Sequence, residues 1–224
     1  MSDNALCIFQ RLCPRDTVLV TVPRGRTIMM RDQDVAFVYH LHEGIAAGVV
    51  TMKDGHEMTG LLVPQAFMGL AGFVDMYTTK HRKHWAEVRA VTPTVYCKVR
   101  REAVWELMDD RSARSEILNL INDSYLSVFR VIGSSMRNDV SIRILSVLQL
   151  IARTVGKSPA GGSVVIQDLS QEELAFLSNV TRPSIAQTLK GLENAGLIQI
   201  TRRNIIIPDL QKLLDITSFD TVFQ

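Results

Sequence analysis

The chain has 224 residues, 46% of them hydrophobic, and a formal net charge at pH 7 of only +2. This length and composition predict one or two buried cores, and two domains are the better expectation. The small net charge excludes a uniformly polybasic nucleic-acid coat, so any surface for an anionic partner must be local.

Nothing in the sequence favours export or membrane insertion. The N-terminal segment MSDNALCIFQRLCPRD lacks the positive flank, apolar core and cleavage site of a signal peptide. No stretch approaches the roughly 20 apolar residues that cross a bilayer. We therefore expect a cytoplasmic protein with no membrane partner.

The cysteines, Cys7, Cys13 and Cys97, predict no special chemistry. They are too few and too irregularly spaced for a disulfide framework, and none belongs to a CxxC pair of the kind that zinc and redox sites use. We expect ordinary or buried thiols and no metal site.

Residues 17–100 consist of short β-rich runs separated by turn residues. The runs include TVLVTV, AFVYHLHEG, IAAGVVTMKDGHEMTGLLV and AVTPTVYCKV, with KDGHE supplying an Asp-Gly hairpin turn. Valine, isoleucine, threonine and tyrosine at this spacing predict an antiparallel sandwich or barrel.

Residues 101–136 run without proline, and glycine appears there only at Gly133. Apolar or small side chains recur at three- and four-residue spacing at Ile117, Leu120, Ile121, Ser124, Val128, Val131 and Ser135. This narrow stripe predicts a long helix that pairs with a second copy of itself. Packing of the stripe on the chain's own β-domain is the alternative.

Two helix signals follow. The segment VSIRILSVLQLIARTV predicts a helix that ends at Gly156. Further on, Ser170 and Glu173 have the spacing of a capping box, so we expect the next helix to begin at Gln171. Asn179 tolerates the left-handed conformation of a tight helix exit.

The segment NVTRPSIAQTLKGLENAGLI, residues 179–198, predicts another helix, capped by Thr181. Arg182 and Pro183 occupy its first turn, where amides have no acceptor within the helix, so the proline begins the helix instead of breaking it. At 3.6 residues per turn, one side carries Ile185, Leu189 and Leu192, and the other carries Pro183, Ser184, Gln187 and Lys190.

Two short helices joined by a tight turn, the second polar and basic at its start, indicate a helix-turn-helix. The following segment AGLIQITRRNIIIPD predicts a β-hairpin wing, and residues 181–203 carry four basic groups against one acid, a local charge of +3. We predict that DNA is contacted by Ser170, Thr181, Arg182, Pro183, Ser184, Gln187, Lys190, Arg202 and Arg203. A winged helix used for protein contact is the alternative.

Six segments in order, VPRGRTI, FVYHLHEG, FMGLAGF, AVTPTVYCKV, DVSIRILSVL and LSQEELAFLSNVTRPSIAQTLKGLENAGLI, resemble landmarks of the cyclic-AMP receptor protein and Fnr family of bacterial transcription regulators. The resemblance covers nearly the whole chain and implies an α+β fold. Residues 1–110 would form an effector-sensing, cyclic-nucleotide-binding-like β-barrel (a double-stranded β-helix), 111–138 a dimerisation helix, and 139–224 a winged helix-turn-helix DNA-binding domain.

The resemblance implies a homodimeric, allosteric transcription regulator and not an enzyme. Its partners would be a near-palindromic double-stranded operator, with half-sites roughly 34 Å apart, and RNA polymerase. Arg182 stands where the family has an arginine opening the recognition helix, whereas Pro183 and Gln187 replace a glutamate and an arginine of the family pattern. We therefore expect an unfamiliar half-site.

Family members that bind cyclic AMP hold it with a Gly-Glu pair and an Arg-Ser or Arg-Thr pair. Here Leu70 replaces the glutamate, and His84 and Trp85 replace the arginine pair. Val128 and Phe129 occupy helix positions where a cyclic-AMP binder has hydroxyls. The resemblance thus predicts an effector pocket at these residues that does not bind cyclic AMP, and leaves the effector and any cofactor unknown.

Other interpretations stay open. The segment KHRKH, residues 80–84, is either an anion site or a solvated loop. His40, His42, His81, His84 and Cys97 are of types that ligate haem or iron, so a haem- or redox-dependent gas sensor is an alternative. An Fnr-type iron–sulfur cluster is disfavoured, because three cysteines without a close pair are too few. A small-molecule enzyme on the barrel is remote, since the chain has no GxSxG and no glycine-rich phosphate loop.

Overall fold

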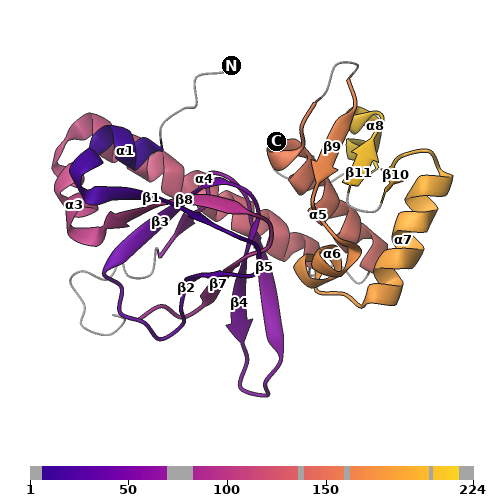
Figure 1. Ribbon diagram of the computed structural model, residues 1–224, viewed down its shortest axis with the longest axis horizontal. Helices are drawn as coiled ribbons and strands as arrows, with labels where there is room; N and C mark the ends of the chain where they lie inside the picture. The colour runs from indigo at the N-terminus through magenta and orange to yellow at the C-terminus, as the bar shows by residue number, and fades with distance from the viewer. Residues whose placement is uncertain (1–6, 70–82, 136–138, 159–161, 202–203, 217–224) are drawn as a thin grey trace. The chain divides into compact units, whose positions relative to one another are not determined.

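The computed structural model describes residues 7–69, 83–135, 139–158, 162–201 and 204–216, with side chains of the long helix described as far as residue 126. The chain divides into two compact units (Figure 1). The N-terminal unit comprises residues 1–58 and 62–129, and the C-terminal unit comprises residues 130–224 together with the short segment Thr59–Leu61. Within these described ranges no helix is both long and apolar enough to cross a membrane.

The N-terminal unit contains two antiparallel four-stranded sheets. The first has the order β1 (Thr17–Val22), β8 (Thr94–Arg100), β3 (Phe37–Glu43) and β6 (Phe67–Met68). The second has the order β2 (Thr27–Met29), β7 (Glu87–Ala90), β4 (Ala46–Thr51) and β5 (Glu57–Leu62). The predicted β-rich region is therefore confirmed for its described residues, 17–69 and 83–100, and the predicted Asp-Gly turn joins β4 to β5 with Gly55 at φ +83°.

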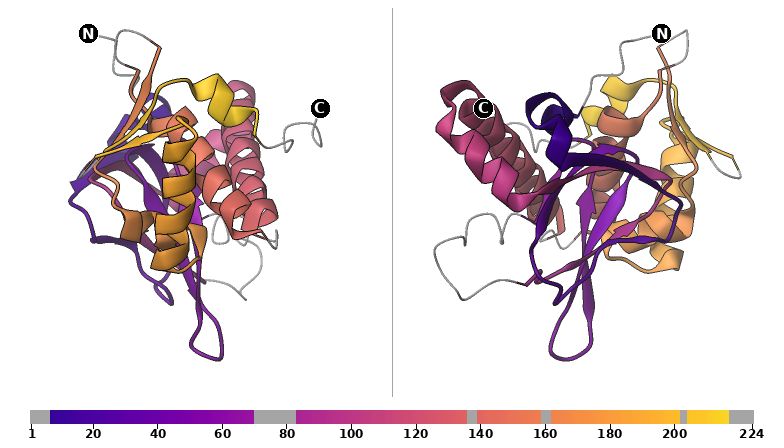
Figure 2. Two further views of the ribbon diagram at one scale, coloured as in Figure 1. Left: turned by 90° about the vertical axis from the view of Figure 1, so that its right-hand side faces the viewer. Right: turned by 60° about the vertical axis from the view of Figure 1, so that its left-hand side comes forward.

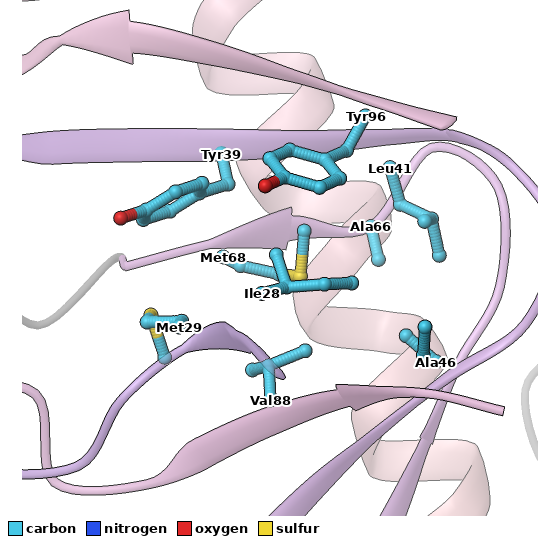
Figure 3. Close-up of a cluster of buried hydrophobic side chains, with 10 residues drawn as sticks. Ile28, Met29, Tyr39, Leu41, Ala46, Ala66, Met68, Val88 and Tyr96 are labelled. Atoms are coloured by element: carbon cyan, nitrogen blue, oxygen red, sulfur yellow. The ribbon is translucent and has the colours of Figure 1, made fainter. Parts of the chain in front are cut away.

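An apolar core fills the space between the two sheets (Figure 3). Tyr39, Leu41 and Tyr96 face it from the first sheet, and Ala46 and Val88 from the second. Since side chains alternate along a strand, these residues place one face of each sheet inside the sandwich.

Helices cover one end of the sandwich. These are α1 (Ile8–Leu12), α3 (Arg101–Glu106) and the first part of α4 (Arg111–Ser135), and Figures 1 and 2 show α1 at the same end as α3. A second apolar cluster joins them to the strands: Cys7, Phe9, Val38, Phe67, Cys97, Val99, Val104, Ile117 and Leu120. Short 3-10 turns at Pro14–Asp16 and Leu107–Asp109 complete this end.

The helical run over residues 101–136 is interrupted at Asp110, which its periodicity did not predict, although the family resemblance implied a helix that starts at residue 111. Between α3 and α4, Asp110 has an extended backbone (ψ 126°). Its side chain accepts a hydrogen bond from the amide of Ala113 at 2.7 Å. A carboxylate that satisfies a first-turn amide favours a new helix start, so α4 begins at Arg111.

The prediction that the α4 stripe faces a second copy is wrong for its described members. Ile117, Leu120 and Ser124 are 0%, 8% and 8% exposed within the single chain. Ile121, the remaining described member, is half-buried and packs against the same cluster. The Ser124 hydroxyl accepts a hydrogen bond from the amide of Phe67 at 2.8 Å. The stripe packs on the chain's own β-domain because strand residues supply the apolar surface that it needs; Val128, Val131 and Ser135 lie outside the described side chains.

The C-terminal unit contains four helices and one three-stranded antiparallel sheet within its described residues. Its elements in order are α5 (Val140–Val155), β9 (Val164–Gln167), α6 (Gln171–Ser178), α7 (Arg182–Asn194), β10 (Gln199–Ile200), β11 (Asn204–Ile207) and α8 (Leu210–Leu214). Asp139 caps α5 by accepting hydrogen bonds from the amides of Ser141 and Ile142, and α5 ends before Gly156 as predicted.

Candidate nucleic-acid interface and sensor core

The capping box that begins α6 is present. The Ser170 hydroxyl accepts a hydrogen bond from the Glu173 amide at 3.2 Å, and the Glu173 carboxylate accepts one from the Ser170 amide at 2.7 Å. The helix ends at Asn179, whose φ of +51° and ψ of +48° are left-handed, as predicted. Ser170 thus stabilises the start of α6. Its contact with DNA stays a prediction.

Replacing Ser170 by alanine is expected to destabilise the C-terminal unit by about 1 kcal/mol, because a first-turn amide of α6 loses its acceptor. Denaturant unfolding followed by circular dichroism measures this change. Ser170→Thr keeps the cap oxygen and serves as the control. Equal unfolding midpoints for Ser170→Ala and the unchanged chain would contradict the stabilising role of the cap.

The first turn of α7 remains open to an anion. Thr181 is the N-cap and Pro183 lies in the first turn, as predicted, but the Thr181 hydroxyl lies 2.9 Å from that of Ser184 and caps no amide. The described first turn also contains no acidic residue. A helix N-terminus with uncapped amides and a positive dipole end attracts phosphate.

The two faces of α7 are sharply different. Ile185 and Leu189 are fully buried, as predicted, whereas Leu192 is half-buried. The opposite face presents Arg182, Pro183, Gln187 and Lys190 as exposed residues, with Ser184 half-buried. The exposed face therefore gathers a guanidinium, an amide and an ammonium group on one rigid helix.

The end of α7 leads directly into the wing. Gly196, at φ +70°, follows the helix, and the Leu197 amide donates to the Leu192 carbonyl at 3.0 Å. This left-handed exit turns the chain into the antiparallel pair β10–β11, to which β9 adds the third strand. The predicted hairpin is therefore confirmed. Arg202 and Arg203, which the sequence predicts at its tip, are outside the described residues.

Arg182 borders a hollow of about 350 Å³ in the C-terminal unit. The start of α6 contributes Ser170, Gln171 and Glu172 to its lining, and the hairpin contributes Ile200 and Thr201. The predicted residues Ser170 and Arg182 therefore share one concave surface, although they belong to different helices.

The predicted effector-pocket residues separate in the structure. His84 is buried, its ring centre is 6.1 Å from that of Tyr39, and burial lowers its pKa. Trp85 is 64% exposed. Leu70 and the side chains of Val128 and Phe129 lie outside the described part of the chain.

The sandwich interior offers mainly apolar surface next to His84. Figure 3 shows the rings of Tyr39 and Tyr96 together among aliphatic and methionine side chains, and their centres are 5.9 Å apart. Burial raises the pKa of both phenols. The two phenol hydroxyls are the polar groups that these core residues bring to the space between the sheets.

The expectation that all cysteines are separate thiols is wrong for Cys7 and Cys97, which form a disulfide. Their spacing of 90 residues carried no signal of a pair. They meet because α1 packs against the strands, where His40 and Cys97 are direct partners on β3 and β8. The His40 Nδ1 atom lies 3.4 Å from the Cys7 sulfur, and Cys13 is free.

A second face of α4 is exposed and carries three large apolar side chains, with the exposed Asn122 between them. Leu118, Tyr125 and Leu126 are 50%, 54% and 41% exposed. At 3.6 residues per turn they lie within roughly 100° of one another around the helix axis, opposite the buried stripe. The sequence pattern of α4 did not reveal this face, because the buried stripe dominated its periodicity.

Two family models match the chain in sequence order. The cyclic nucleotide-binding domain matches residues 19–111, and the Crp-like helix-turn-helix domain matches residues 142–216. The matches coincide with the β-sandwich and with the unit that contains α6 and α7.

Relatives resemble the chain over most of its length. The CRP-like cAMP-activated global transcriptional regulator of Mycobacterium tuberculosis is 25% identical, with 87% of this chain and 85% of that protein covered. The global nitrogen regulator of a Synechocystis species is 22% identical, with 85% and 84% covered.

Solved structures show the same fold. A CRP-family transcriptional regulator from Thermus thermophilus superposes with a TM-score of 0.69 at 20% identity, covering 88% of this chain and 95% of that one. FixK2 from Bradyrhizobium japonicum superposes at 0.70 with 14% identity, covering 90% and 98%. With both domain models matched in order and the fold shared throughout, the chain belongs to the Crp/Fnr family of transcription regulators.

Proposed function

We propose that this regulator binds a near-palindromic operator as a homodimer and that its β-domain, responding to an unidentified effector, shifts the DNA-binding units between competent and incompetent arrangements. The proposed limits are residues 1–110 for the sensor, 111–138 for the dimerisation helix and 139–224 for the DNA-binding domain. We place its action in the cytoplasm and include RNA polymerase among its partners, both on family resemblance.

The observation that carries DNA binding is the polarity of α7. Its inner side is anchored by Ile185 and Leu189, so the exposed Arg182 and Gln187 are held on a rigid element. Arginine pairs with guanine edges and glutamine with adenine edges in the major groove. The open first turn beside Arg182 supplies amides for a neighbouring phosphate.

Footprinting on the region upstream of the gene tests this proposal. We expect protection of two half-sites related by a twofold axis and separated by one helical turn, roughly 34 Å. Protection of a single asymmetric site would contradict the proposal. A complete absence of protection, both without effector and with cell extract added, would also contradict it.

The second apolar face of α4 supports the homodimer. A helix that already buries one stripe in its own domain rarely exposes further large apolar side chains unless they meet a partner. Leu118 and Leu126 lie on a helix, so a parallel copy of α4 can match them residue for residue across a twofold axis. A second copy of this chain is therefore the occupant that we propose.

The sandwich interior argues against cyclic AMP as the effector. A buried cyclic phosphate needs a bidentate cation and hydrogen-bond donors. His84 replaces that cation in sequence, but burial lowers its pKa, so its imidazole is neutral at pH 7. The described core beside it is apolar.

We expect cyclic AMP to bind with a dissociation constant no tighter than about 1 mM, equivalent to about −4 kcal/mol. Isothermal titration calorimetry measures the affinity, and the cAMP-activated relative from M. tuberculosis is the positive control. Micromolar binding together with stronger operator affinity would overturn this part of the proposal.

A further inference from the structure

Three side chains from separate parts of the N-terminal unit converge at one buried point. Cys7 precedes α1, His40 lies on β3 and Cys97 on β8, and their ligand atoms all lie within 4.8 Å of one another. Their exposed fractions are 2%, 1% and 0%. Within the described ranges, this is the only group of three histidine, cysteine or acidic side chains so placed.

We propose that the reduced chain binds one thiophilic divalent cation, with zinc as the physiological ion, through Cys7, His40 and Cys97. In the structure the two sulfurs are bonded to each other, so the disulfide and the ion exclude one another. Two thiolates and one imidazole form a soft ligand set that zinc accepts, with a water molecule in the fourth position.

The spacing of the ligand atoms fits an ion. The His40 Nδ1 atom is 3.4 Å from the Cys7 sulfur. Bonds of about 2.3 Å to sulfur and about 2.0–2.1 Å to nitrogen at a tetrahedral angle place those two atoms about 3.5 Å apart. The Cα atoms of Cys7 and Cys97 are 6.6 Å apart, near the upper end of the roughly 4.4–6.8 Å range of disulfides.

The orientation of His40 is the observation that a disulfide alone leaves unexplained. Its Nε2 atom lies 3.1 Å from the side-chain oxygen of Gln65. With Nε2–H donating to that oxygen, Nδ1 has a lone pair available toward the Cys7 sulfur, and ligating histidines are commonly held in this way. Gln65 has a φ of +77°, an unfavourable conformation for a residue with a side chain.

The surroundings favour a buried site to which bulk water has little access. Phe9 packs edge-on against the His40 ring with centres 6.2 Å apart, and Val38 and Val99 belong to the same cluster. An apolar shell limits access to the single water ligand and strengthens the bonds between an ion and its thiolates. Cys13, also near this cluster, lies by Thr17 and is not one of the three converging ligands.

Reduction of the disulfide and binding of zinc require no redox group in the protein besides the two cysteines. A small dithiol reduces the disulfide with two electrons and two protons, leaving two thiols and an oxidised reductant. Zinc then replaces the two thiol protons, which pass to solvent. Reducing conditions are the relevant ones because a DNA-binding regulator works where thiols are kept reduced, and this step rests on the proposed function.

Cobalt and zinc titrations of the reduced full-length chain test the site. We expect one Co²⁺ per chain, with thiolate-to-cobalt charge transfer and the visible bands of tetrahedral cobalt, and displacement by one Zn²⁺. Cys7→Ser, Cys97→Ser and His40→Asn should each abolish stoichiometric binding, whereas Cys13→Ser and His56→Asn should bind as the unchanged chain does. Gln65→Leu should lower the affinity by about 10–100-fold, because His40 loses its orienting partner.

The unchanged chain decides the outcome even if a variant fails to fold. A folded, fully reduced chain with three titratable thiols and no bound metal overturns the proposal and leaves a simple dithiol–disulfide pair. Iron with acid-labile sulfide, or binding that survives His40→Asn but not Cys13→Ser, also overturns it. Because the readout is metal content, any of these results leaves the proposed DNA binding unaffected.

Discussion

Arg182→Ala is expected to weaken operator binding by about 2–6 kcal/mol, which is about 1–3 kcal/mol for each of two half-sites. The reason is that Arg182 is exposed at the start of α7, on the helix that would enter the major groove. A lost arginine–base contact removes discrimination as well as affinity. Gel shifts on the footprinted operator and on a scrambled sequence measure both.

Two further variants separate the recognition of bases from the nonspecific electrostatic attraction between the protein and DNA. Lys190→Ala should weaken binding to all DNA sequences alike and reduce the salt dependence of that binding, because an ammonium group contacts phosphate as a point charge. Lys212→Ala removes an exposed cation of α8 in the same unit and should leave operator affinity nearly unchanged. Operator binding by Arg182→Ala within twofold of the unchanged chain would contradict the assigned role.

Leu118→Glu is expected to weaken the dimer by at least about 3 kcal/mol, a factor of roughly 100 or more in its dissociation constant. The twofold axis introduces the carboxylate twice into one apolar interface, where it is left unpaired. Sedimentation equilibrium of the full-length chain measures the change. Operator binding should weaken in parallel, because the two half-sites are then no longer linked.

Ser112→Glu is the matched control for this charge. Ser112 is exposed in the first turn of α4, where a carboxylate favours the helix dipole, and it lies away from Leu118, Tyr125 and Leu126. The Ser112→Glu chain should dimerise as the unchanged chain does. A Leu118→Glu chain that remains dimeric at nanomolar concentration would exclude this face as the dimer interface.

The C-terminal unit was predictable because its signals are local. The capping box at Ser170, the left-handed Asn179 and the proline in the first turn of α7 each act within a few residues, so the sequence contains both partners of every interaction. The face of α7 that contacts the core follows from the helical period in the same way. The boundary between sensor and DNA-binding domains and the contacts to DNA stay predictions.

Predictions about α4 failed where a sequence pattern has two explanations. The stripe through Ile117, Leu120 and Ser124 fits a partner helix and a neighbouring sheet equally well, and periodicity cannot tell the two apart. Periodicity also missed the break at Asp110, although the family resemblance implied a helix start at residue 111. An aspartate within a helical run gives no signal of a break until its side chain accepts a hydrogen bond from a nearby amide.

By itself the sequence determined the order of β-domain, long helix and winged helix-turn-helix, because alternation, helical period and capping are properties of neighbouring residues. Only the tertiary structure decided which side of α4 is left exposed and that Cys7, His40 and Cys97 meet. Those outcomes depend on contacts between residues far apart in the chain. Whether such contacts form depends on the balance between favourable packing and the loss of chain entropy, which no local sequence pattern records.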